Sequence, residues 1–80
     1  GVTVVKPSAE TVEHSESGNI LIALRANGDV WMDRRQVDIR DVRPAIERLH
    51  VERPEDTVVI LADRNSNAAV MAKLMDEVRS

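Results

Sequence analysis

The sequence predicts an α+β fold of two layers, in which two helices pack on one face of a small mixed β-sheet. Three patterns predict this fold. Apolar residues alternate over residues 20–26, recur at helical spacing over residues 38–52, and form a continuous run over residues 57–62 that leads into a second helical pattern. The predicted order is β-hairpin, helix, strand, helix, with a possible extra edge strand at the N-terminus.

Composition limits the choices further. The chain has 80 residues, a net charge of −3 and no cysteine, and Trp31 is its single aromatic residue. One domain with a thin core is therefore expected. Basic residues are interleaved with acids, which argues against nucleic-acid binding. Disulfides and thiolate zinc sites are excluded, and no apolar run reaches the roughly 18 residues of a membrane-spanning helix.

The N-terminal residues divide into an arm and a linker. Residues 2–5 favour a β-strand, and Pro7 ends it because proline cannot donate to a β-ladder. Residues 9–19 combine low hydrophobicity with several acids, which indicates a flexible linker. We therefore predict an arm and linker over residues 1–19 and a folded domain over residues 20–80. The last helical pattern has no stop signal, and a helix that ends so small a sheet domain invites a further strand, so we expect this domain to be truncated before a final strand.

A hairpin opens the folded domain. Asn27-Gly28 separates two apolar runs and predicts a type I′ turn, which needs positive φ at both central residues. Val30 and Met32 should face the core on the second strand. Trp31 should then lie on the opposite face.

Two helices and one strand complete the domain. Apolar spacing predicts the first helix from about Val42 after a loose first turn, since Pro44 is tolerated in a first turn but disrupts a helix interior. A buried strand begins at Thr57. Ser66 or Asn67 caps the final helix. The apolar stripes of the two helices are Ile39, Val42, Ala45, Ile46 and Leu49 in the first, and Val70, Met71, Leu74, Met75 and Val78 in the second.

The residues that could carry chemistry have simple structural explanations. His14 falls in the linker, and His50 lies near a helix C-terminus, where a histidine interacts favourably with the helix dipole. The carboxylates are scattered and no serine occupies a nucleophile elbow. The sequence therefore predicts a protein that is not an enzyme and has no cofactor and no metal site.

Three positions remain candidates for binding. Trp31 either contacts a partner or packs against a neighbouring segment. Asp63 and Arg64 follow the buried strand, at the end where open α/β sheets often bind ligands. Asp63 has a second explanation, because an aspartate at this place can turn the chain toward the last helix.

The chain resembles the periplasmic domain of the ExbD/TolR family. The resemblance rests on the element order, on Val-Val-Ile-Leu-Ala-Asp-Arg over residues 58–64, and on Val-Met-Ala-Lys-Leu-Met-Asp-Glu-Val-Arg over residues 70–79. Residues 5–9 also resemble the proline-containing segment that follows the family's transmembrane helix. The chain departs from the family at residues 66–68, where Ser-Asn-Ala replaces an apolar-proline-tyrosine motif.

The resemblance implies a role in a proton-driven motor of the inner membrane. Such a domain would be the periplasmic portion of a single-pass protein whose transmembrane helix, with its proton-coupling aspartate, lies outside this chain and contacts an ExbB/TolQ-like partner. It would bind a TonB- or TolA-like transducer, the peptidoglycan cell wall or a second copy of itself, and so support energised transport across the outer membrane.

A strand-addition hypothesis follows for the N-terminal arm. Val2, Val4 and Val5 would add to an exposed sheet edge of their own domain or of a dimer mate, and so control partner access. Together with Trp31, Asp63 and Arg64 they form the predicted partner-binding set. The alternative function is a small peptide-binding adaptor or secretion-system module that uses its sheet edge.

Overall fold

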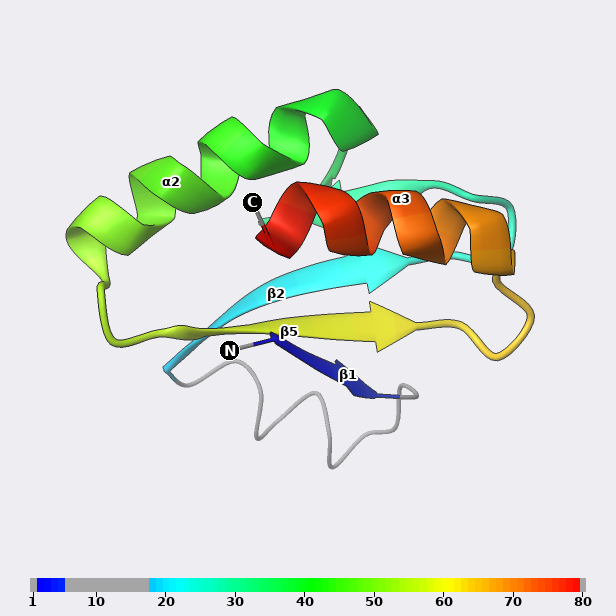
Figure 1. Cartoon of the computed structure of the whole chain (residues 1–80), viewed down its shortest axis with the longest axis horizontal. Coiled ribbons are helices and arrows are strands. Elements are labelled where there is room, and N and C mark those ends of the chain that lie inside the picture. The colour runs from blue at the N-terminus through cyan, green and yellow to red at the C-terminus, as the bar shows by residue number, and fades with distance from the viewer. Residues whose placement is uncertain (1, 6–17, 80) are drawn as a thin grey trace.

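A computed structural model describes residues 2–5 and 18–79 (Figure 1). These residues form a mixed sheet with the strand order β1-β5-β2-β3-β4. The strands are β1 (Val2–Val5), β2 (Asn19–Leu24), β3 (Val30–Met32), β4 (Arg35–Val37) and β5 (Thr57–Ala62). Strand β5 runs parallel to β1 and β2, and β3 is antiparallel to β2 and β4. Most of the predicted linker lies outside the described residues.

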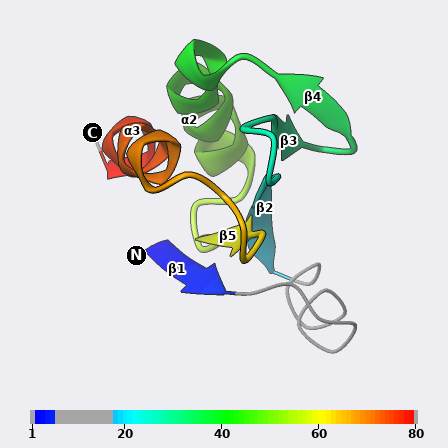
Figure 2. The same ribbon diagram turned by 90° about the vertical axis from the view of Figure 1, so that its right-hand side faces the viewer.

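Both helices cover the same face of the sheet, as predicted. They are α2 (Val42–Glu52), which follows the 3-10 turn η1 (Ile39–Asp41), and α3 (Ala68–Arg79). Figure 2 shows the two helices side by side on one side of the sheet, with β1 and β4 at its opposite edges. The predicted fold class is confirmed, and the possible N-terminal strand is present as β1.

The core lies between this sheet face and the helices. Ile20, Ile22, Leu24, Val30, Met32, Val42, Ile46, Val58, Ile60, Ala62 and Leu74 are buried there in one cluster. The predicted stripes of both helices pack into or against this cluster. Alternation therefore assigned the inward residues of β2 and β3 correctly. Ala26 is the exception, since it lies exposed in the loop after β2.

The helix starts follow from local hydrogen bonds. An Asp38 side-chain oxygen accepts from the backbone N–H of Arg40 at 2.8 Å and caps the 3-10 turn. Regular α-helix begins at Val42, which leaves Pro44 in the first turn as predicted. Asn67, the second of the two predicted caps, accepts from the N–H groups of Ala69 and Val70 at 2.7 and 3.3 Å.

The predicted type I′ turn at Asn27-Gly28 is wrong. Gly28 has φ 93°, but Asn27 is not in the positive-φ region. The Gly28 N–H donates to the Arg25 carbonyl and the Arg25 N–H to the Asp29 carbonyl, so the loop has three residues. The difference follows from the alternation of inward and outward residues, because directly paired residues lie on the same face of a sheet. A two-residue loop would pair inward-facing Leu24 with outward-facing Trp31, whereas the longer loop pairs Leu24 with inward-facing Val30.

A tight two-residue turn occurs instead at Asp33-Arg34, where sequence analysis had placed no strand pair. Asp33 and Arg34 have φ 51° and 64°, and Met32 pairs directly with Arg35. This geometry matches a type I′ turn, whose usual residues are Asn-Gly or Asp-Gly. Arginine gives no turn signal at its second position, and β4 has only three residues, so the sequence did not indicate this fourth neighbour.

Arg34 should be a strained residue. A non-glycine residue in the left-handed region costs about 1 kcal/mol, and glycine relieves that cost while losing some entropy on folding. We expect Arg34→Gly to raise the free energy of unfolding by about 0.5 kcal/mol in urea titrations followed by Trp31 fluorescence. Arg35→Gly is the control. It removes the side chain of a residue in ordinary strand conformation and should lower the free energy of unfolding. Equal destabilisation by both variants would contradict the proposed turn strain.

Candidate functional site

Strand β1 forms one free edge of the sheet. It pairs in parallel with β5, with Val2 opposite Val58 and Val4 opposite Ile60. Val2 packs partly against the core, whereas Val4 is 46% exposed. Strand β1 is thus a partly exposed edge strand, and its second backbone edge is unpaired among the described residues.

The Asp63-Arg64 junction turns the chain. The Asp63 N–H donates to the Leu24 carbonyl, and its side-chain Oδ1 accepts from the Asn65 N–H at 2.8 Å. The Ser66 N–H in turn donates to the Asp63 carbonyl. Asp63 therefore has the structural role that the sequence offered as its second explanation. Arg64 is exposed and forms no ion pair with a described residue.

Trp31 lies on the sheet face away from the helices, as predicted, but it is only partly exposed. The guanidinium carbon of Arg25 sits 4.4 Å from the centroid of its ring, a cation-π contact. The indole Nε1–H is buried and has no acceptor among the described residues. Alternation along β2 puts Arg25 on the same outer face as Trp31, but the sequence analysis did not consider it as a neighbour of Trp31.

The pairing register brings two of the candidates into one row. Val5 is opposite Leu61, Leu61 opposite Ala23, and Ala23 opposite Trp31. Three strand spacings of about 4.8 Å put the Val5 and Trp31 positions about 14 Å apart. Because β1, β5 and β2 are parallel, this row lies next to the strand ends that lead to Asp63 and Arg64. The structure therefore gathers the C-terminal end of β1, Trp31 and the Asp63-Arg64 junction toward one end of the sheet.

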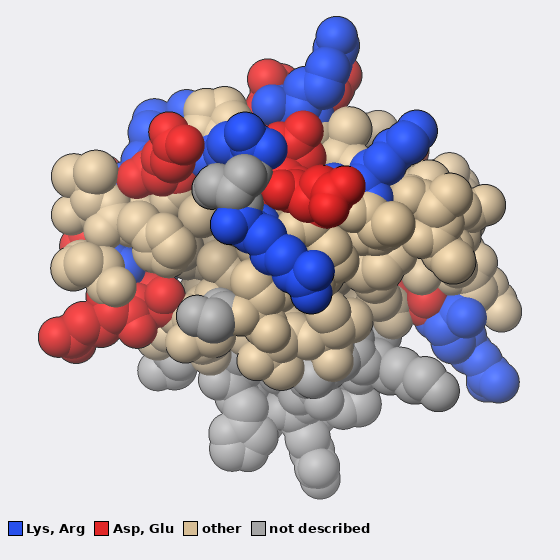
Figure 3. Space-filling model, in the orientation of Figure 1, with Lys and Arg blue, Asp and Glu red and all other residues tan. Residues whose placement is uncertain are grey.

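The surface shows no continuous charge of one sign on the face drawn in Figure 3, where described Lys and Arg groups alternate with Asp and Glu. Within residues 2–5 and 18–79, no three His, Asp or Glu side chains are grouped closely enough to hold a metal ion. No helix in the same part of the chain is long and apolar enough to cross a membrane.

Comparisons with known proteins give the family. The model of the family described as "Biopolymer transport protein ExbD/TolR" matches residues 1–80 of the chain. Biopolymer transport protein exbD2 of Vibrio cholerae serotype O1 (strain ATCC 39315 / El Tor Inaba N16961) is 32% identical over 79 residues, which are 99% of this chain and 59% of that protein. No solved structure matches the chain significantly.

The two residues of the junction should differ in their effect on stability. Asp63→Ala removes the acceptor for the Asn65 N–H and should lower the free energy of unfolding by about 1 kcal/mol. Arg64→Ala should change it by less than about 0.5 kcal/mol, because the side chain is exposed. Urea titration followed by Trp31 fluorescence measures both. A loss on Arg64→Ala as large as that on Asp63→Ala would show that Arg64 is structural.

Proposed function

Because the chain belongs to the ExbD/TolR family, we propose that it is the periplasmic domain of a single-pass inner-membrane subunit driven by the proton-motive force. It binds a TonB- or TolA-like transducer or the cell wall, and it passes on the motion that an ExbB/TolQ-like partner generates. The observation that carries this proposal is the family match over residues 1–80. A general accessory role in biopolymer transport follows from the family itself.

The membrane anchor belongs, in this proposal, to another part of the protein. The chain spans 59% of the length of its Vibrio relative, and a protein as long as that relative would have room for a membrane-spanning segment. The family match also favours this function over the peptide-binding adaptor that the sequence left open. No catalytic step is involved, because the domain acts by binding and transmitting force.

Strand β1 is the element best placed to regulate binding. Ordering its four residues costs about 1–2 kcal/mol each in backbone entropy. Each hydrogen bond to β5 contributes only about 0.5–1.5 kcal/mol. Of the β1 side chains that the structure describes, Val2 is partly buried while Thr3 and Val4 are exposed. These terms oppose one another, so another strand that makes the same hydrogen bonds to β5 could replace β1 at small cost in free energy.

Displacement of β1 would uncover the outer edge of β5 for a transducer segment or for β1 of a second copy. Val2, Val4 and Val5 would then act as a covering strand, and homodimerisation by exchange of this strand would follow the same physics. Trp31 with Arg25, and the exposed Arg64, would supply side-chain contacts at the adjoining end of the sheet.

A disulfide lock tests this switch. Thr3 and Val59 are direct register partners, and neighbouring strands lie at a Cα separation suitable for a disulfide. The chain has no native cysteine, so Thr3→Cys with Val59→Cys should form one defined bond. We expect the oxidised variant to lose about tenfold or more in affinity for the periplasmic fragment of a TonB-like transducer, measured by calorimetry.

The reduced form of the same variant is the matched control and should bind like the unmodified chain. Sedimentation with purified peptidoglycan provides the parallel assay for the cell wall. Undiminished transducer binding and undiminished peptidoglycan binding by the oxidised protein would together rule out β1 displacement as the switch.

A further inference from the structure

The edge opposite β1 is also open. Strand β4 pairs only with β3 among the described residues. In a two-residue hairpin the residues that flank the turn exchange backbone hydrogen bonds, which applies here to Met32 and Arg35. Val30 and Val37 form the next such pair. The N–H and C=O of Gln36 therefore point outward, where an added strand can reach them.

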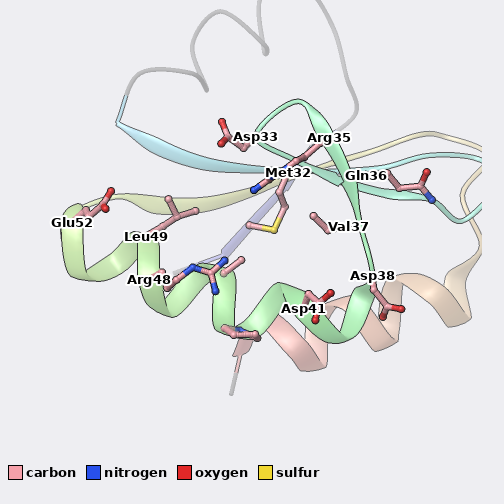
Figure 4. Close-up of a pocket in the computed structure, with 12 residues that line it drawn as sticks. Met32, Asp33, Arg35, Gln36, Val37, Asp38, Asp41, Arg48, Leu49 and Glu52 are labelled. Atoms are coloured by element: carbon pink, nitrogen blue, oxygen red, sulfur yellow. The ribbon is translucent and has the colours of Figure 1, made fainter.

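A cavity of about 600 Å³ lies beside this edge, between β4 and α2. Its apolar lining comes from Met32, Val37, Pro44, Ala45 and Leu49. Figure 4 shows the Met32 side chain reaching from the sheet toward the cavity, with Leu49 on the helix opposite. A strand laid along β4 sends every second side chain to the helix side of the sheet, and those side chains would enter this cavity.

Two arginines reach the cavity from opposite walls, Arg35 from β4 and Arg48 from α2 (Figure 4). Neither forms an ion pair with a described residue. The nearby Asp38 is already engaged, since hydrogen bonds from the Arg40 side chain and backbone lower the pKa of its carboxyl to about 2. Two arginines that line one cavity and have no ion-pair partner among the described residues favour a ligand carboxylate, which arginine can hold in bidentate fashion.

The other charges around the cavity limit how acidic the ligand can be. Asp33, Asp41 and Glu52 also line it, and they are exposed. A run of acidic residues would be repelled by these three carboxylates, whereas a single carboxylate is attracted by the two arginines and meets less repulsion. A second copy of the chain paired through β4 would bring the short strand Arg35–Val37, in which no residue is acidic, with Asp33 and Asp38 only beyond its ends.

We propose that the β4 edge and its cavity form a second docking site, which takes an extended segment of a partner protein carrying one acidic side chain among apolar ones. The segment adds as a sixth strand beside Gln36. Its apolar side chains pack on Met32 and Leu49, and its carboxylate lies between Arg35 and Arg48. This site is at the opposite edge from β1 and does not depend on the switch proposed for β1.

The test selects displayed random linear peptides on the full chain and then measures the affinity of an enriched peptide by fluorescence anisotropy. We expect enriched peptides to carry one Asp or Glu two residues from Val, Ile or Leu. Arg48→Glu and Gln36→Pro should each weaken binding by about tenfold or more. Proline is tolerated at an edge position whose N–H points outward, so Gln36→Pro should still fold, and circular dichroism checks this.

Arg79→Glu is the matched charge reversal, on an exposed helix residue away from the cavity, and should change the affinity by less than about twofold. Three results would overturn the proposal: no enrichment, enrichment of basic or unpatterned peptides, or affinities that Gln36→Pro leaves unchanged. A dimer in sedimentation that Gln36→Pro dissociates would also overturn it, because the edge would then serve a second copy.

Discussion

The structure depends on the parallel pairing of β5 with its two neighbours. Ile60 is fully buried at the centre of this strand, facing the helices, and Val59 and Leu61 are nearly buried on the other face. A strand buried on both faces must satisfy its backbone groups through neighbouring strands, since water cannot reach them. Strand β2 provides one neighbour permanently. Strand β1 provides the other with only four residues, so the most buried strand of the domain has its weakest partner at one edge.

That asymmetry links the fold to the proposed function. The helices and the inner face of the sheet form one continuous core, and they account for most of the buried apolar residues. The two outer strands, β1 and β4, contribute little to it. The proposed displacement of β1 and the proposed strand addition at β4 would therefore leave most of the core in place. The two edges differ in their chemistry, since β4 lies beside a cavity with two arginines.

The sequence predicted the elements whose patterns are set by the core. Alternation in β2 and the continuous apolar run of β5 each identified a strand, and Pro44 located the start of α2. The sequence did not predict the features that depend on the number of residues in a loop. The loop between Arg25 and Asp29 has three residues, and in the resulting register Ala23 pairs with Trp31, so that Arg25, two residues further along, can stack on the indole ring. Strand β4 was missed because its turn uses Arg34 where glycine would have signalled it. Asp63 was predicted with two roles, and only its hydrogen bonds in three dimensions show the structural one.

Amide hydrogen exchange of residues 2–5, in the free chain and with a transducer fragment bound, shows whether β1 leaves β5 when the transducer binds. The account predicts that these amides are partly protected in the free chain by pairing with β5 and lose that protection when the transducer binds, while the amides of β2 keep theirs. Amides of residues 2–5 that remain unprotected in both states would contradict the account, because β1 would then never cover the edge of β5.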